Sequence, residues 1–135
     1  MTKKQLKPLM ELLNNKPFIA FAYLFGSRAK GCANKRSDWD IAVFFSDVPK
    51  KIGRWPTFKL EAELSRAVEG EVQVTVLNHP LPPVLGFEIV KNGEVLLDRD
   101  ENLRMEFENR ILRHYYDWQY FLRRQMKEER HLPDT

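Results

Sequence analysis

Residues 18–27 read FIAFAYLFGS, and residues 37–45 read SDWDIAVFF. The first stretch is an apolar and aromatic run that ends at Gly26, which is typical of a strand buried on both faces. The second stretch predicts another strand from Asp38 to Phe45, with two acids at its beginning. Together these stretches predict a sheet that carries acidic side chains at one end.

The segments around this pair alternate between helical and extended patterns. An apolar stripe at i, i+3, i+4 and i+7 predicts a helix before the first strand. Its expected buried residues are Leu6, Leu9, Met10 and Leu13. Further along, the patterns predict a helix capped by Thr57 and a strand at residues 72–76. They then predict a short helix starting in the proline-rich stretch 79–83, a short strand at 95–97 and a long helix over 100–129. This order predicts an α/β or α+β domain.

Length and composition predict one globular domain over residues 1–135. The chain is 43% hydrophobic and 30% charged, an ordinary balance for a folded protein. Cys32 is the single cysteine, so we expect no intrachain disulfide and a reducing, cytoplasmic setting. No apolar run approaches the roughly 18 residues of a membrane span, and no signal-peptide pattern follows the basic N-terminus. We therefore expect neither a secreted nor a membrane protein.

Positive charge is concentrated in residues 1–37, which carry eight lysines and arginines and one acid, whereas the whole chain has a net charge of +3. A solvated lysine face on the first helix accounts for half of this excess. The other basic residues surround the acidic motif and indicate a polyanion nearby, a nucleotide or a nucleic acid. They are Arg28, Lys30, Lys35 and Arg36. Direct nucleic-acid binding is the weaker interpretation, because no RNA- or DNA-binding motif is present.

Asp38 and Asp40 point most directly to chemistry. Side chains two residues apart on a strand share a face, so both carboxylates project together while Trp39 faces the other way. Two carboxylates at this spacing suit Mg²⁺, which phosphoryl-transfer sites hold in pairs about 3.5–4 Å apart. Asp38 and Asp40 are therefore the candidate metal ligands and catalytic residues.

The turn after the first strand supplies a candidate nucleotide-binding site. Gly26 lets the backbone approach a phosphate closely, and Ser27 offers a hydroxyl and an amide. Arg28 and Lys30 add positive charge against a triphosphate. The alternative is a loop without catalytic function, whose acids cap a turn.

The pattern GS-x10-DxD at residues 26–40 resembles the signature of the nucleotidyltransferase superfamily that includes DNA polymerase beta and kanamycin nucleotidyltransferase. The small size, the turn at residues 93–98 and the YYD sequence at 115–117 make the chain similar to the minimal nucleotidyltransferases, or MNT proteins. The resemblance implies a mixed β-sheet with helices packed on it. It also implies Mg²⁺-dependent transfer of a nucleoside monophosphate, AMP from ATP, with release of pyrophosphate. Many MNT proteins are antitoxins beside a HEPN-domain ribonuclease toxin, and some transfer AMP to a tyrosine of that toxin.

One position departs from the family pattern. The family places a third carboxylate on the strand after the second core helix, where it helps to bind metal and accepts the proton of the attacking hydroxyl. The matching residue is Gln73, whose amide cannot take that proton. Glu71, two residues earlier on the same face, is the candidate substitute. Without a substitute, we expect a protein that binds NTP and one metal but transfers slowly or not at all.

Two kinds of function therefore remain open. One is an enzyme with Asp38, Asp40 and Glu71 as its catalytic residues. The other is an antitoxin that neutralises its partner by binding alone, through terminal-helix aromatics that exceed what one helix face can bury. These aromatics are Tyr115, Tyr116, Trp118, Tyr120 and Phe121. The same helix is a candidate surface for oligomerisation.

The histidines have simpler interpretations. Arg110 and His114 lie four residues apart on the terminal helix and are expected to form a surface pair. His79 precedes a proline and is expected to serve a turn. Three histidines scattered in this way predict no metal site.

Overall fold

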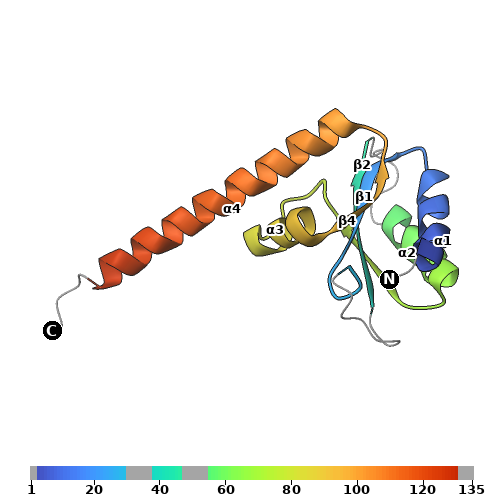
Figure 1. The fold of residues 1–135 in the computed structure, drawn as a ribbon, viewed down its shortest axis with the longest axis horizontal. Coiled ribbons are helices and arrows are strands. Elements are labelled where there is room, and N and C mark those ends of the chain that lie inside the picture. Colours follow the sequence, from blue (N-terminus) through green and yellow to red (C-terminus); the bar gives the residue numbers. More distant parts are fainter. Residues whose placement is uncertain (1–2, 30–37, 47–54, 131–135) are drawn as a thin grey trace.

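The computed structural model describes residues 3–29, 38–46 and 55–130. In these residues helices and strands alternate along the chain, as the sequence patterns predict (Figure 1). The helices are α1 (Lys3–Asn14), α2 (Trp55–Val68), α3 (Pro83–Asn92) and α4 (Glu101–Arg130). The strands are β1 (Ile19–Phe25), β2 (Trp39–Phe45), β3 (Val72–Val76) and β4 (Glu94–Asp98).

The strands form one mixed sheet in the order β3-β2-β1-β4. β1 is antiparallel to both β2 and β4, whereas β2 and β3 are parallel. All seven residues of β1 are buried, because helices cover both faces of the sheet at its centre. The mixed sheet with packed helices that the resemblance implies is therefore confirmed.

The sheet separates two apolar cores. On one face, Leu9 and Leu13 of α1 and Leu64 of α2 pack against strand residues such as Leu24 and Ile41. Figure 1 shows α1 and α2 together on this side of the sheet, and α3 and α4 on the other side. The two helical layers hold the strands in a fixed register, so residues at the strand ends keep defined positions.

The second core lies between the sheet and the α3–α4 pair. It contains Phe21 and Tyr23 of β1, Ile89 of α3 and Phe107 of α4. The rings of Phe21 and Phe107 lie 5.5 Å apart, which fixes the first half of α4 to the central strand.

Two local features differ from the sequence-based expectation. Met10 is 43% exposed, because α1 packs through Leu6, Leu9 and Leu13 and leaves Met10 at the margin of the stripe. α2 begins at Trp55 rather than after a cap at Thr57. Pro56 is compatible with this earlier start, since proline is tolerated in the first turn of a helix.

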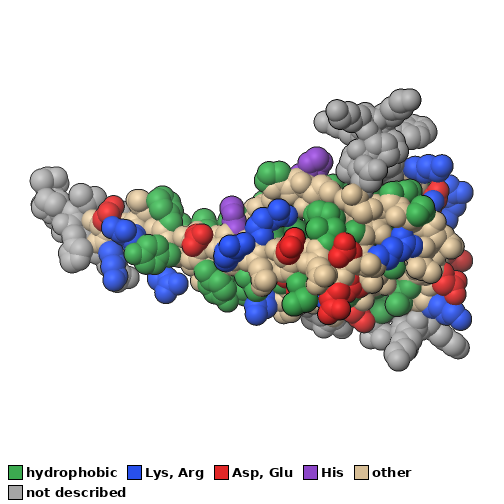
Figure 2. Space-filling view, turned by 90° about the horizontal axis from the view of Figure 1, so that it is seen from above, with side chains coloured by type: hydrophobic (Ala, Val, Ile, Leu, Met, Phe, Trp, Pro, Cys, Tyr) green, Lys and Arg blue, Asp and Glu red, His purple; other side chains and the backbone are tan. Residues whose placement is uncertain are grey.

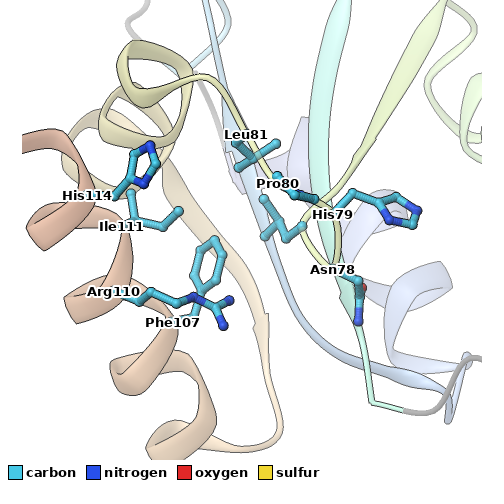
Figure 3. Close-up of a pocket in the computed structure, with 9 residues that line it drawn as sticks. Asn78, His79, Pro80, Leu81, Phe107, Arg110, Ile111 and His114 are labelled. Atoms are coloured by element: carbon cyan, nitrogen blue, oxygen red, sulfur yellow. The ribbon is translucent and has the colours of Figure 1, made fainter. Parts of the chain in front are cut away.

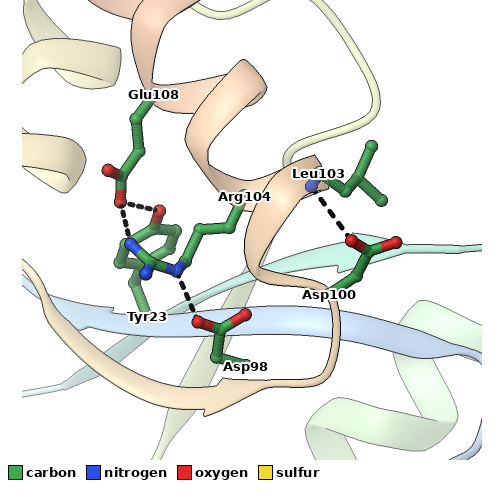
Figure 4. Close-up of polar contacts among 6 residues, drawn as sticks. All are labelled: Tyr23, Asp98, Asp100, Leu103, Arg104 and Glu108. Carbon is green, nitrogen blue, oxygen red and sulfur yellow. Dashed lines mark hydrogen bonds and ion pairs between the residues drawn. The ribbon is translucent and has the colours of Figure 1, made fainter.

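A polar network fastens α4 to two strands (Figure 4). The buried Tyr23 hydroxyl of β1 donates to Glu108 Oε1 over 2.7 Å. Arg104 donates to the same Glu108 oxygen at 2.9 Å and to Asp98 Oδ2 of β4 at 2.7 Å. Burial, and then the hydrogen bond and charge of Glu108, raise the pKa of Tyr23 far above its usual value. At the helix start, Asp100 Oδ1 accepts a hydrogen bond from the Leu103 amide over 3.1 Å.

The apolar side chains of α4 are buried along the first part of the helix and exposed beyond it. Phe107 is 3% exposed, whereas every residue from 120 to 128 is exposed. Figure 1 shows this second part extending past α3. Among the described residues, no helix combines the length and apolar character needed to cross a membrane.

Candidate active site

The four defining residues of the motif, Gly26, Ser27, Asp38 and Asp40, lie at one end of the sheet. β1 ends there at Phe25, while β2 and β3 both begin there, because β1 runs antiparallel to the other two. The register pairs Asp40 with Phe25 on one side and with Gln73 on the other. Segments far apart in the sequence thus bring their polar residues to the same place.

Asp38, Asp40 and Gln73 share one face of the sheet. Trp39 belongs to the core under α1 and α2, so the flanking carboxylates project toward the opposite face, as alternation predicts. Gln73 likewise alternates with Val72, which lies in that same core. The amide Nε2 of Gln73 donates a long hydrogen bond of 3.5 Å to Asp38 Oδ2. An amide therefore contacts Asp38 at Gln73, where the resemblance leads one to expect a third acid.

Gly26 makes the close approach between the turn and the acids possible. Its φ is 77°, in the region that glycine adopts at little cost. A Cβ at this position would lie 2.5 Å from Asp40 Oδ2 and 3.3 Å from its Cγ. The turn backbone consequently passes directly over the Asp40 carboxylate, and any side chain larger than hydrogen would displace one of them.

The electrostatics of the pair favour a bound cation. Burial, and then the negative charge of Asp38, raise the pKa of the Asp40 carboxyl above its usual value. A cation bound between the two carboxylates offsets the repulsion that opposes the ionisation of Asp40. Within the part of the chain that the structure describes, no group of three or more His, Cys, Asp or Glu side chains is placed to hold a metal ion. Two carboxylates nevertheless fit Mg²⁺, which takes one or two protein carboxylates and completes its shell with phosphate and water.

Side chains of α2 hold β3 in place beside the acids. β3 is an edge strand, and its outward amides bond to the helix instead of to another strand. The Val74 amide donates to Glu61 Oε1 at 2.9 Å, and the Val72 amide donates to Ser65 Oγ at 3.1 Å. These contacts flank Gln73 and fix its position. The sequence patterns predicted a helix in this region and contained no signal for this polar support.

The structure lays Arg28 over Trp39, with the guanidinium carbon 4.2 Å from the ring centroid. Trp39 itself is 3% exposed and anchored by its amide, which donates to the Glu71 carbonyl at 2.9 Å. Arg28 therefore follows the turn and packs on the back of the strand that carries the two acids. The sequence places Arg28 near the motif but contains no signal for this stacking.

Of the remaining predicted site residues, some lie in the described part of the chain and others lie outside it. Ser27 lies half-buried in the turn directly after Gly26. Glu71 is exposed and immediately precedes β3, at the same sheet end as the acids. Lys30, Lys35 and Arg36 lie outside the described residues.

Arg110, His114 and His79 meet at a different place. They line a cavity of about 300 Å³ between α4 and the segment after β3, above an apolar floor that includes Phe107 and Ile111. Figure 3 shows Arg110 beside the Phe107 ring and His79 turned away from His114. The Arg110 guanidinium carbon lies 5.8 Å from the centroid of that ring. This cavity begins at Leu77, past the far end of β3, so it is separate from the carboxylate pair. All three polar residues are exposed, which agrees with the surface position expected for Arg110 and His114.

Comparison with known sequences agrees with this geometry. Residues 7–102 match the family described as polymerase beta, nucleotidyltransferase. The chain is also similar to the protein adenylyltransferase MntA of Shewanella oneidensis, with 34% identity over 85 residues. That alignment covers 63% of this chain and 58% of the length of the relative.

Solved structures extend the similarity to nearly the whole fold. A crystal structure of a toxin-antitoxin with AMP-PNP contains a chain that is 27% identical, with a TM-score of 0.71, covering 91% of this chain and 96% of that one. A structure of a tri-AMPylated Shewanella oneidensis HEPN toxin in complex with MNT antitoxin matches at 25% identity with a TM-score of 0.67, covering 95% and 98%. The family match includes the turn, both acids and all four strands, and its length exceeds half of the chain. The chain therefore belongs to the polymerase beta nucleotidyltransferase family.

Proposed function

We propose that this protein is a Mg²⁺-dependent adenylyltransferase that moves AMP from ATP to a tyrosine of a HEPN-domain partner and thereby acts as its antitoxin. The observation that carries the proposal is the convergence of Gly26, Asp38 and Asp40 at one sheet end, with the turn backbone against the Asp40 carboxylate. Similar chains are named protein adenylyltransferase or occur with AMP-PNP and with an AMPylated HEPN toxin, which supports the choice of nucleotide and acceptor.

Each residue at this end has a part in binding the nucleotide. Asp38 and Asp40 would hold Mg²⁺, which supplies positive charge against the triphosphate during phosphoryl transfer. The Gly26–Ser27 turn offers backbone amides and a hydroxyl to the phosphates. The Arg28 guanidinium packs over Trp39 on the other face of β2, so its positive charge lies at the same sheet end but does not face the carboxylates. Most of the expected catalysis is therefore positioning and electrostatic stabilisation.

The reaction balances without an oxidant or reductant. The tyrosine hydroxyl oxygen forms a bond to the α-phosphorus of ATP, the bond from that phosphorus to the β-phosphate bridge breaks, and pyrophosphate leaves. The phenolic proton must pass to a base. Gln73 cannot accept it, so we assign this role to Glu71, the exposed carboxylate that precedes β3 at the same sheet end.

A second candidate function is neutralisation of the partner by binding alone. It is favoured by one specific observation, the Gln73 amide beside Asp38 where the family has a third acid. In that case the protein would bind the HEPN partner, and ATP with one metal ion, without efficient transfer.

We place either activity in the cytoplasm. The support is the presence of a single cysteine, Cys32, in a chain with the composition of an ordinary globular protein. This assignment stays a prediction that cell fractionation with an antibody against the protein can test.

Incubation with ATP labelled at the α-phosphate, Mg²⁺ and the HEPN protein separates the two functions. We expect label and the mass of AMP on a HEPN tyrosine, lost in the Asp38→Asn/Asp40→Asn variant and after chelation of Mg²⁺. A matched control is Asp100→Asn, which changes an acid at the start of α4, away from the motif. Binding of the HEPN protein without any label in the wild type would reject the enzyme and leave neutralisation by binding alone.

A further inference from the structure

The second part of α4 leaves the body of the protein with its apolar side chains uncovered. We call residues 116–128 the distal segment. From residue 120 to residue 128 every side chain is exposed, and Figure 1 shows the helix extending past α3 with no other described element beside it. A helical segment of this length is marginally stable in water unless its apolar residues are packed. Its exposed residues therefore need an explanation outside this chain's own core.

Apolar residues surround the axis of the distal segment. At 100° per residue, three groups lie about 120° apart: Tyr116 with Tyr120, Phe121 alone, and Leu122 with Met126. Their side chains are 52%, 61%, 57%, 38% and 56% exposed, respectively. Apolar side chains that point in three directions, between charged ones, cannot all be covered by one flat surface. A membrane surface or a nucleic acid would cover one side and leave the others in water.

The charges of the distal segment are unevenly placed. A groove of about 380 Å³ is lined by Tyr120, Arg123, Arg124, Met126 and Lys127, and no acid is among the described residues that line it. The Arg124 guanidinium lies 5.9 Å from the Tyr120 ring centroid. Figure 2 shows basic and hydrophobic side chains next to each other along this part of the helix. A surface that covers the tyrosine side would therefore need acidic residues to match these cations.

The beginning of the segment is held rigidly. Phe87 of α3 stacks on Tyr115 with ring centroids 4.0 Å apart, and it meets Tyr116 edge-on at 6.4 Å. Tyr115 also contacts Trp118 at 5.9 Å. This aromatic cluster fixes the direction in which the helix leaves the body, so a partner binds a preorganised helix and loses less conformational entropy on binding.

We propose that the distal segment is the docking element for a protein partner, which encloses it in an apolar groove with acidic residues along one rim. A helix about 20 Å long and 11 Å across offers about 700 Å² of lateral surface. This area is close to the roughly 800 Å² that each partner contributes to a stable complex. Since the apolar residues face three directions, the partner contacts the helix on more than one side.

The identity of the partner rests on the proposed function, which names a HEPN-domain protein. The docking element itself rests on the exposed residues of α4, on the other side of the sheet from α1 and α2. Docking through α4 would hold the partner while its tyrosine reaches the sheet end that carries Asp38 and Asp40.

Calorimetric titration of the HEPN protein into the full-length chain tests the proposal. We expect Phe121→Ala to weaken binding about 10-fold or more, since buried aromatics dominate interface energies. A double charge reversal, Arg124→Glu/Lys127→Glu, is expected to weaken binding and to reduce its salt dependence. The matched control is Phe58→Ala on α2, which removes a phenylalanine of similar exposure, 64%, from a different helix. Circular dichroism checks that all variants keep their helix content.

Each other outcome would overturn the proposal. Unchanged binding by Phe121→Ala would place the interface elsewhere. A wild-type dimer in light scattering that Phe121→Ala dissociates would assign the segment to a second copy of the chain. Tight binding of single-stranded RNA that the charge reversal abolishes would assign it to nucleic acid.

The label-transfer assay in the same samples separates this inference from the proposed function. If AMP reaches the HEPN protein while Phe121→Ala binds it normally, the docking inference fails and the enzyme stands. If Phe121→Ala loses binding but the wild type transfers no AMP, the docking inference stands and the enzyme fails.

Discussion

The backbone of Gly26 passes so close to Asp40 that a methyl group there would collide with the carboxylate, at 2.5 Å from Oδ2. We therefore expect Gly26→Ala to reduce Mg²⁺-dependent ATP binding at least 10-fold, because either the turn or the acid must move. The positive φ of 77° adds a cost of about 1–2 kcal/mol to folding. Calorimetry with ATP and Mg²⁺, together with thermal unfolding, measures both effects.

Gly70→Ala is the control for this substitution. A Cβ at Gly70 meets the Trp39 ring nitrogen at 3.3 Å, a tight contact that lies on the opposite face from the carboxylates. We expect ATP binding to persist in this variant. Equal ATP affinity in wild type and Gly26→Ala would contradict the assignment of the turn to the nucleotide.

Substituting Gln73 tests directly how much the missing third acid slows the transfer of AMP. The register places it beside Asp40, and its amide donates to Asp38. Gln73→Asp would restore a carboxylate, and we expect transfer to accelerate about 10-fold or more, the scale of a positioned general base. Glu71→Gln is expected to slow the wild type by a similar factor if Glu71 accepts the proton. Single-turnover rates over a range of pH provide the measurement. Slower transfer by Gln73→Asp would reject the benefit of a third acid at this position, and unchanged transfer by Glu71→Gln would reject Glu71 as the proton acceptor.

At the level of single residues, the sequence predicted the parts of the site that depend on local spacing. Strand alternation is a local property, so the shared face of Asp38 and Asp40 followed from their spacing of two residues. The stacking of Arg28 on Trp39 and the Glu61 contact with Val74 depend on which segments become neighbours in space. No local pattern carries that information, so these contacts required the structure.

At the level of elements, apolar patterns located the strands well because burial on both faces leaves continuous apolar runs. β1 and β2 each begin within one residue of the predicted start. Helix beginnings were less predictable, since α2 starts at Trp55 and includes Pro56 and Thr57. A proline in the first turn is compatible with a helix, and the competing cap signal at Thr57 was the weaker one here.

The attachment of α4 to β1 depends on the buried hydroxyl of Tyr23. Its bond to Glu108 is 2.7 Å long, and Glu108 is also held by Arg104. We expect Tyr23→Phe to lower the free energy of unfolding by about 1–3 kcal/mol, as for a lost hydrogen bond to a charged group. Chemical denaturation at neutral pH provides the measurement, and the exposed Tyr120→Phe is the control, with an expected change within about 0.5 kcal/mol.

The same tyrosine predicts a loss of stability at alkaline pH. The pKa of Tyr23 is raised in the folded protein, first by burial and then by Glu108, above the value near 10 of an unfolded chain. The stabilisation is therefore fully present below about pH 10 and is lost progressively as the pH rises above it. Tyr23→Phe removes this contribution, so an alkaline decline as steep in the variant as in the wild type would contradict the assignment.

At the scale of the whole molecule, the carboxylates and the distal segment occupy different regions. Asp38 and Asp40 lie at a strand end, whereas the distal segment belongs to a helix that extends past α3 (Figure 1). The sequence identified both the acids and the surplus aromatics, since each is a local feature. Their separation depends on the order β3-β2-β1-β4 and on the direction of α4, which the apolar patterns alone do not specify.

This separation predicts that the two regions affect different kinetic constants. Phe121→Ala changes a residue that is 57% exposed on the distal segment, so we expect KM for the HEPN protein to rise about 10-fold with kcat nearly unchanged. Asp38→Asn removes a carboxylate from the reacting end, so kcat should fall by orders of magnitude while the affinity for the HEPN protein is retained. Steady-state transfer assays at varied HEPN concentration measure both constants. If Phe121→Ala instead lowered kcat at a saturating concentration of the HEPN protein, docking on α4 and chemistry at the sheet end would be coupled. The distal segment would in that case help to place the acceptor tyrosine as well as to hold the HEPN protein.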